Sequence, residues 1–250
     1  MKKFDSNNYD FNPDSKTGIY LIHGFSGTTY ELKILARALK KGGHHVVLNN
    51  LPGHGTTVED CNKYTYHDWL NYSKMELAKL VSTSDSVFIV GCSMGAVIAL
   101  YLASLFPING VIVGAPVIKF KLSFSTNYLN TIFCRLLKKR DKKLTFPKEI
   151  RDTIQFYGYD YYPLIALNEF RKMNKMVLKK LEGIKSPTLI MHSIKDKVSI
   201  RENVDIIKSK INSEHSEFLN LKHAHHNLFD TNQETKIIND RVLAFIENYQ

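Results

Sequence analysis

A glycine–x–serine–x–glycine pentapeptide at residues 91–95 lies between a run typical of a buried strand and a run typical of a helix. Residues 86–90 are Ser-Val-Phe-Ile-Val, and residues 96–100 are Ala-Val-Ile-Ala-Leu. Glycine on both sides lets the backbone turn sharply, because no Cβ atom is present to collide with it. The pentapeptide therefore predicts a strand, a tight turn and a helix, with Ser93 at the tip of the strand.

Short apolar runs alternate with longer helical patterns along most of the chain. Several of these runs are continuously apolar, which is typical of parallel strands covered on both faces. This order predicts an α/β fold, with a mostly parallel central sheet flanked by helices and right-handed crossovers. The predicted strands are 19–22, 45–48, 86–90, 110–113, 188–192 and 216–221, and the predicted helices are 30–41, 67–82, 96–105, 200–210 and 235–249.

One interval, from about residue 117 to residue 185, interrupts the alternation. It has no convincing strand pattern, although residues 164–181 carry apolar side chains at helical spacing. In an open α/β sheet such an excursion is expected over the carboxyl ends of the strands, where ligands bind. The predicted division is therefore 1–116 as the first part of the core, 117–185 as a helical cap, and 186–250 as the second part of the core.

The composition indicates a globular protein with one sizeable core, since 44% of the 250 residues are hydrophobic and 23% are charged. The formal net charge is +10, but the lysines are scattered and only residues 138–143 form a dense basic run. No nucleic-acid motif is present, so no nucleic-acid partner is expected. A solvated basic surface is the favoured interpretation, and weak contact with anionic lipid is the alternative.

Location is predicted from what the sequence lacks. No stretch approaches the roughly 18 apolar residues of a membrane span, and the N-terminal residues have no apolar signal-peptide segment. Three widely spaced cysteines, Cys61, Cys92 and Cys134, predict free thiols in a reducing compartment. These features together predict a cytoplasmic protein without integral membrane association, and they leave the oligomeric state open.

Ser93 is the candidate nucleophile. A serine needs a base and a group that orients the base, and with this type of turn they follow in the order acid, histidine. Asp196 lies in the loop just after the predicted strand 188–192, so it is the candidate acid; an ordinary turn aspartate is the alternative. The helix that begins behind Ser93 favours negative charge at this point.

Three histidines, His223, His225 and His226, follow the last predicted strand, and only one is needed as the base. We predict His225, which the small Ala224 precedes, and retain His226 and then His223 as alternatives. The cluster could suggest a metal site, but no suitable Cys, His or Asp spacing supports one. Neither a metal nor an organic cofactor is expected.

The oxyanion formed during acyl transfer needs two backbone N–H donors. Met94, the residue after the nucleophile, is one candidate, and Phe25 in the loop His23-Gly24-Phe25-Ser26-Gly27 is the other. Both residues are also expected to contact the substrate. The Phe25 ring is a candidate wall of the acyl pocket, or else part of the core.

These motifs together resemble bacterial carboxylesterases and monoacylglycerol lipases of the α/β-hydrolase superfamily. The resemblance extends along nearly the whole chain, from the loop at 23–27 and the Gly53-His54-Gly55 turn to the pentapeptide at 91–95 and the Ala224-His225 pair. In that family the catalytic histidine precedes an acidic residue by five positions, as His225 precedes Asp230. The resemblance implies the α/β-hydrolase fold, with a small helical cap inserted after the sixth strand.

The resemblance also implies a serine carboxylic-ester hydrolase that forms an acyl-enzyme. The implied substrates are lipophilic acyl esters, either short- to medium-chain esters or monoacylglycerols. The same three residues could serve a thioesterase, a C–C bond hydrolase or an acyltransferase, because function depends on the pocket and the leaving group. A non-catalytic ligand-binding protein with the same fold is the remaining alternative.

Overall fold

The computed structural model describes residues 3–145, 148–151 and 155–250, and its centre is a seven-stranded sheet with the strand order β1-β3-β2-β4-β5-β8-β9. β1 runs antiparallel to β3, and all the other neighbours in the sheet are parallel. The strands are β1 (Tyr9–Phe11), β2 (Thr17–Ile22), β3 (His45–Leu48), β4 (Ser86–Cys92), β5 (Gly110–Gly114), β8 (Thr188–Ser193) and β9 (Ser216–Leu221).

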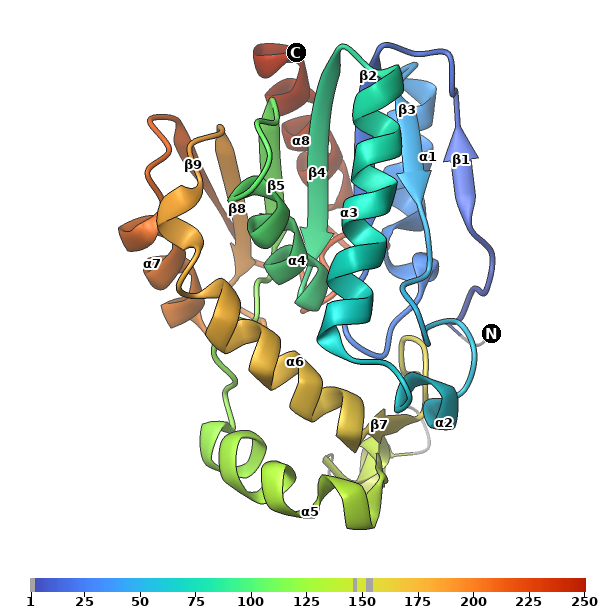
Figure 1. Cartoon of the computed structure of the whole chain (residues 1–250). Helices are drawn as coiled ribbons and strands as arrows, with labels where there is room; N and C mark the ends of the chain where they lie inside the picture. The colour runs from blue at the N-terminus through green and yellow to red at the C-terminus, as the bar shows by residue number, and fades with distance from the viewer. Residues whose placement is uncertain (1–2, 146–147, 152–154) are drawn as a thin grey trace.

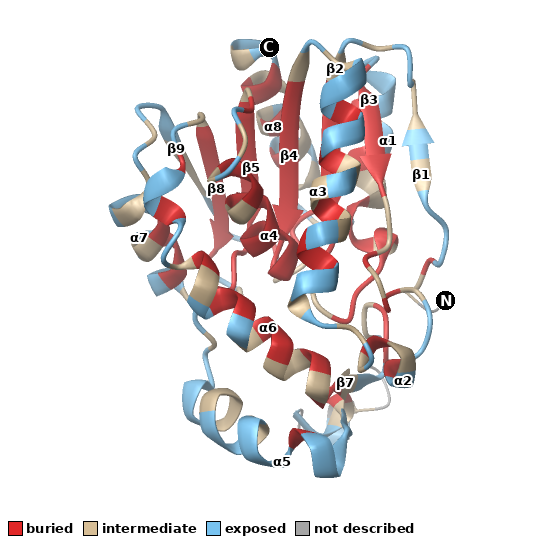
Figure 2. Ribbon diagram, viewed as in Figure 1, coloured by how far each residue is buried: buried red, intermediate tan, exposed pale blue. Residues whose placement is uncertain are grey.

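Helices cover both faces of this sheet, as Figure 1 shows. Alternate residues of β2 and β4 point to opposite faces, so Tyr20 and Ile89 join one apolar cluster while Leu21 and Val90 join the other. The first cluster lies under α3 (Tyr66–Thr83), α4 (Met94–Ala103) and α7 (Arg201–Lys210), and the second lies under α1 (Lys33–Lys41) and α8 (Thr235–Tyr249). The buried residues in Figure 2 accordingly concentrate in the sheet and on the inner sides of these helices.

The turn at residues 91–95 depends on its two glycines. A Cβ atom on Gly91 would lie 2.2 Å from the carbonyl oxygen of Gly95, and a Cβ atom on Gly95 would lie 2.0 Å from that of Ile22. Ser93 itself has a φ of 56°, a region that costs a non-glycine residue roughly 1–3 kcal/mol. Close packing of β4 against α4 therefore holds Ser93 in its strained position at the end of the strand.

Residues 117–185, called the insertion from here on, leave the sheet after β5 and return to it at β8. The expectation of an insertion after the sixth strand is wrong, because only five strands precede it. Figure 1 shows the insertion at the carboxyl end of the parallel strands, with α6 (Leu164–Val177) next to the sheet and α5 (Asn130–Leu137) on its far side. Two short antiparallel strands, β6 (Lys139–Asp141) and β7 (Tyr161–Pro163), also belong to it, so it is not purely helical.

Most of the predicted core elements occur in the structure with shifted ends. β3 and β9 have the predicted bounds, and the predicted helix 30–41 begins with a 3-10 turn, Thr29–Leu32, before α1. The short α2 (Val58–Cys61) was not predicted, and the three-residue β1 lies in residues 4–18, where the family resemblance implies a short strand region. Among the described helices, none is both long enough and apolar enough to cross a bilayer. The three cysteines are buried free thiols, as predicted.

Candidate active site

Loops that follow four parallel strands meet at one end of the sheet. The loop after β2 carries Phe25, the turn after β4 carries Ser93, the loop after β8 carries Asp196, and the loop after β9 carries His226. Because the carboxyl ends of parallel strands lie at the same edge, residues far apart in the sequence come together there. This edge holds the candidate site.

Ser93, His226 and Asp196 form a continuous hydrogen-bonded chain. His226 Nε2 lies 3.0 Å from Ser93 Oγ, and His226 Nδ1 lies 2.8 Å from Asp196 Oδ2. Because an ionised carboxylate can only accept, Nδ1 carries the proton and Nε2 is left to accept the hydrogen bond of the Ser93 hydroxyl. This tautomer is the one that allows an imidazole to take a proton from a serine.

The prediction of His225 as the neighbour of Ser93 and Asp196 is wrong, because His226 occupies that position. The His225 side chain is exposed instead. The register is set at Ala224, whose N–H donates to Glu234 Oε2 at 2.8 Å and whose carbonyl accepts a hydrogen bond from Ser193 Oγ. With Ala224 fixed inward, the next residue points to solvent and the one after it turns back towards Ser93.

The acidic residue five positions after His225 has another set of partners. Asp230 accepts hydrogen bonds from Tyr157 Oη and from Lys3 Nζ, the latter at 3.0 Å. Burial alone would raise the pKa of Asp230, but the hydrogen bonds lower it below its usual value. Asp230 therefore joins the insertion and the N-terminal segment to the histidine loop.

Asp196 is held as a carboxylate. Its side chain is fully buried. Oδ1 accepts the N–H groups of Val198 and Ser199 at 2.7 and 2.9 Å, while Oδ2 accepts from His226. Burial by itself would raise the pKa of Asp196, but these hydrogen bonds and the nearby imidazole lower it below the usual range. The group thus stays ionised and fixes the imidazole.

Of the two residues predicted to stabilise an oxyanion, Met94 follows Ser93 in the chain, and Phe25 lies in a loop that packs against Ser93. Met94 is the first residue of α4, and the first N–H groups of a helix have no partner within it. Phe25 lies in a tight turn in which Gly27 N–H donates to Gly24 O at 3.2 Å. A Cβ atom on Gly24 would lie 3.2 Å from Ser93 Cβ, so this turn touches the nucleophile directly.

A buried carboxyl group that the sequence did not indicate, that of Glu31, forms a hydrogen bond with the backbone of this loop. Glu31 is buried, and its Oε2 accepts the N–H of Gly24 at 2.7 Å. Burial raises the pKa of Glu31 to about 7, against the opposing effect of the Gly24 hydrogen bond. A Cβ atom on Gly27 would lie 2.1 Å from Glu31 Oε1, so Gly27 leaves the space that the carboxyl group fills. No local pattern distinguishes Glu31 from any other helical glutamate.

Two other histidines, His23 and His54, are buried near the site, and their contacts are structural. His23 Nδ1 lies 2.8 Å from the Gly24 carbonyl, and its Nε2 accepts the N–H of Leu51 at 3.0 Å. Burial lowers the pKa of His23 to about 4, so it is neutral. His54 lies in the predicted turn and contacts the rings of His23 and Trp69. Within the described residues, no group of three His, Cys, Asp or Glu side chains is arranged to hold a metal ion.

Aromatic side chains from the insertion pack against the Phe25 loop. The Phe25 ring stacks on Phe170 of α6 at a centroid distance of 5.6 Å, and Phe120 meets Phe170 edge-on at 5.1 Å. Phe25 and Phe120 are half-buried, and Phe170 is buried. An apolar surface built from both the core and the insertion therefore lies beside the Ser93 turn.

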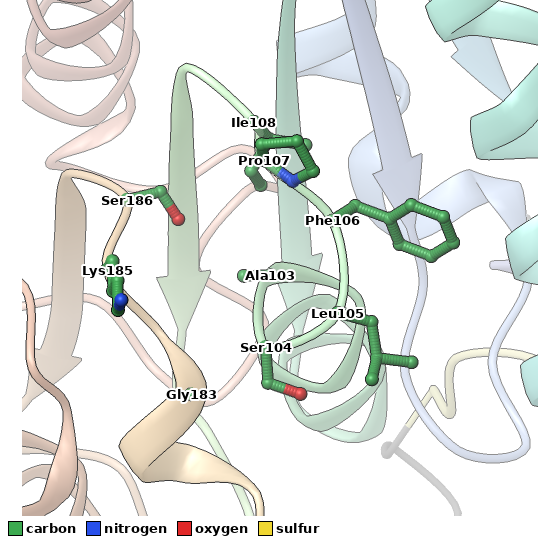
Figure 3. A pocket seen from close by; sticks show the side chains of 9 residues that line it. All are labelled: Ala103, Ser104, Leu105, Phe106, Pro107, Ile108, Gly183, Lys185 and Ser186. Atoms are coloured by element: carbon green, nitrogen blue, oxygen red, sulfur yellow. The ribbon is translucent and has the colours of Figure 1, made fainter.

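A separate pocket, shown in Figure 3, lies at the opposite end of the sheet. Its lining consists of residues 103–108, Gly183, Lys185 and Ser186, which precede β5 and β8. Since both strands are parallel, these segments lie at their amino ends, away from Ser93. The lining contains no histidine or carboxylate, and Lys185 is its only ionisable side chain.

Comparison with known proteins identifies the family of the chain. A family model described as serine aminopeptidase, S33, and named Hydrolase_4, matches residues 13–233. The chain belongs to the Hydrolase_4 family. The Ser93 turn, Asp196 and His226 all lie within the matched region. The protein is therefore a hydrolase.

Relatives of this Hydrolase_4 chain include enzymes that act on esters. A thermostable monoacylglycerol lipase of Bacillus sp. (strain H-257) is 30% identical over 242 residues, which are 93% of this chain and 91% of that protein. A carboxylesterase of Bacillus subtilis (strain 168) is 23% identical over 231 residues, 92% of each chain. The predicted resemblance to monoacylglycerol lipases and carboxylesterases is thus confirmed.

Solved structures confirm the α/β-hydrolase fold. A structure described with LipS and LipT, two metagenome-derived lipolytic enzymes, matches with a TM-score of 0.86 and 22% identity, over 99% of this chain and 100% of that chain. A soluble variant of the Saccharomyces cerevisiae monoglyceride lipase, in complex with a substrate analogue, matches with a TM-score of 0.80 and 16% identity, over 100% of this chain and 97% of that chain.

Proposed function

We propose that the protein is a serine carboxylic-ester hydrolase in which Ser93 is the nucleophile, His226 the general base and Asp196 the residue that orients the base. The observation that carries this proposal is the chain of two hydrogen bonds, 3.0 Å from Ser93 to His226 and 2.8 Å from His226 to Asp196. This arrangement supplies a nucleophile, a base in the required tautomer and an ionised partner for the imidazolium that forms.

The proposed reaction has two steps. Ser93 Oγ attacks the ester carbonyl while His226 Nε2 takes its proton, and His226 then returns that proton to the departing alcohol. Water next attacks the acyl-enzyme with His226 again as base, which releases the carboxylic acid and restores Ser93. The N–H groups of Phe25 and Met94 stabilise the oxyanion in each step, and each donor is worth roughly 3 kcal/mol in a site of this kind.

The proposed substrates are lipophilic acyl esters, namely short- to medium-chain esters or monoacylglycerols. The half-buried rings of Phe25 and Phe120 and the buried ring of Phe170 support this choice, because they offer an apolar surface for an acyl chain beside Ser93. The insertion supplies two of the three rings. We therefore propose that residues 117–185 act as the cap of the site and that its contacts help to determine chain-length preference.

Hydrolysis of p-nitrophenyl esters from acetyl to palmitoyl, by the wild type and Ser93→Ala together, tests the proposal. We expect activity that peaks at one chain length in the wild type and is lost in the variant. A folded wild-type protein that is inactive on every ester would contradict the proposal. An acyl-CoA and an aminoacyl anilide, added to the same panel, would then separate thioester from amide hydrolysis.

A further inference from the structure

The outer side of the insertion is apolar where a surface helix is usually polar. A π-helical turn, Ser125–Leu129, leads into α5, and eight large apolar side chains at 122–137 are between 44% and 78% exposed. Figure 2 shows α5 coloured mainly as exposed, on the side of the insertion that faces away from the sheet. These eight residues, called the apolar face, are Leu122, Phe124, Tyr128, Leu129, Ile132, Phe133, Leu136 and Leu137.

The polarity of α5 is inverted relative to an ordinary amphipathic helix. Two hydrogen bonds join it to α6, since Asn130 Nδ2 donates to the Leu164 carbonyl at 3.1 Å and Thr131 Oγ1 donates to Asn168 Oδ1 at 3.3 Å. Cys134 is the only fully buried residue of the helix. A surface helix normally turns its apolar stripe inward. Single exposed apolar residues are ordinary, but a contiguous set marks a surface that binds something.

Basic residues border the apolar face. Eight lysines and arginines but only one aspartate lie between residues 119 and 143, a net charge of +7 out of +10 for the whole chain, although Lys142 is buried and does not belong to the border. Lys121 and Lys138, which lie before and after the apolar face, are exposed, as is Arg135 within α5. Lys119 and Lys139 form ion pairs with Glu202 and Glu59. The two glutamates offset the charge of these two lysines, so the exposed Lys121, Arg135 and Lys138 supply the positive charge of the border.

We propose that the apolar face, with its basic border, docks onto an anionic lipid surface. Apolar side chains would enter the boundary between headgroups and acyl chains while the lysines and arginines meet the negative headgroups. A second copy of the chain fits less well, because a two-fold symmetric contact through the same face would bring two strongly positive borders together. Charge complementarity thus favours lipid over self-association.

The position of the face gives docking a defined orientation. α5 and its apolar face lie at the carboxyl end of the sheet, the end that also carries Ser93, as Figure 1 shows for α5 and β4. Docking through α5 would therefore turn the Ser93 end of the molecule towards the lipid. The inference itself rests on exposure, contacts and charge, and it does not depend on the proposed ester hydrolysis.

Co-sedimentation with vesicles tests the inference with the full chain. The wild type should sediment with vesicles of phosphatidylglycerol and phosphatidylcholine, and far less with phosphatidylcholine alone. Ile132→Ser combined with Leu136→Ser removes two apolar side chains that are 69% and 78% exposed, and should weaken binding about tenfold or more. The matched control, Met75→Ser with Ile237→Ser, removes side chains that are 60% and 53% exposed elsewhere and should bind as the wild type does.

A second pair of variants isolates the charge. Lys121→Gln with Lys138→Gln should weaken binding to anionic vesicles and reduce its salt sensitivity. Lys16→Gln with Lys41→Gln removes the same charge from exposed positions at the amino end of the sheet and should have little effect. Circular dichroism and the urea midpoint of unfolding serve as folding controls for all four variants.

Three outcomes would overturn the inference. One is wild-type protein that does not bind anionic vesicles. Another is equal binding to neutral and anionic vesicles that the lysine variants leave unchanged. The third is a concentration-dependent dimer that Ile132→Ser with Leu136→Ser dissociates, without vesicle binding, which would make the apolar face a contact between two copies.

Discussion

Glu31 places an ionisable group beneath the proposed oxyanion loop without contact with water. Its pKa is raised to about 7 by burial, while an exposed glutamate titrates near 4.5. Between these values the folded protein holds a proton that the unfolded chain has lost. The free energy of unfolding should therefore fall as the pH rises through this window, because the folded state must then bury a charge.

Glu31→Gln should remove this pH dependence. The glutamine oxygen can still accept the Gly24 N–H, but it cannot ionise. Relative to the wild type, the variant should gain up to about 3 kcal/mol of unfolding free energy between about pH 5 and about pH 7. Urea unfolding of both proteins at several pH values measures the difference between their unfolding free energies. The other titrating groups are common to both proteins, so their contributions cancel in this difference. Parallel stability profiles would show that Glu31 does not titrate in this window.

At the scale of elements, a short segment of the insertion is held by three separate parts of the core. Gly158 N–H donates to the Lys3 carbonyl at 2.9 Å, and Tyr159 N–H donates to the Ser26 carbonyl at 3.1 Å. Tyr157 bonds to Asp230, as described above. Residues 157–159 thus connect the N-terminal segment, the Phe25 loop and the histidine loop, so their position should affect the geometry of the site.

Gly158→Ala tests this connection. Gly158 has a φ of 70°, and a Cβ atom there would lie 1.9 Å from the Ser26 carbonyl oxygen. The matched control is Gly43→Ala, with a φ of 84° and no atom within 4 Å of the added Cβ. Each variant should lose about 1 kcal/mol or more of stability from backbone strain. Only Gly158→Ala should also reduce ester turnover by about tenfold or more. Equal effects on turnover would contradict the connection.

Local patterns were sufficient to predict most elements of the core and the helix α6 of the insertion, but not the strands β6 and β7. The turn at 91–95 was predictable because a glycine–x–serine–x–glycine sequence between a strand and a helix is typical of a sharp strand-to-helix turn. β6 and β7 gave no such signal, since each has three residues and β6 reads Lys-Arg-Asp. Their pairing joins positions about 20 residues apart, which only the folded insertion brings together.

In the candidate site, the histidine loop likewise could not be predicted from local sequence patterns. Ser93 and Asp196 were predictable because Ser93 follows an apolar strand directly and Asp196 lies in the loop just after another. The choice among His223, His225 and His226 depends on contacts of Ala224 with Glu234 and Ser193, which are 10 and 31 residues away in the chain. Spacing to Asp230 was misleading, because that aspartate binds Tyr157 and Lys3 instead.

For the molecule as a whole, the fold and the distribution of surface charge depend on different residues. The two apolar clusters on either side of the sheet fix the α/β-hydrolase architecture, which was predictable from the alternation of strands and helices. The net charge of +10 indicated little by itself. The structure shows where part of that charge lies, because the exposed Lys121, Arg135 and Lys138 border one exposed apolar helix on the insertion. Composition cannot reveal such an arrangement, since it depends on which side of α5 faces α6.

The most direct test of the proposed mechanism compares p-nitrophenyl ester hydrolysis by His226→Ala and His225→Ala. The two variants remove the same group from adjacent positions, one within hydrogen-bond distance of Ser93 and one exposed. We expect His226→Ala to lose activity by at least about a thousandfold and His225→Ala to remain close to the wild type. Loss of activity in His225→Ala with retention in His226→Ala would contradict the account.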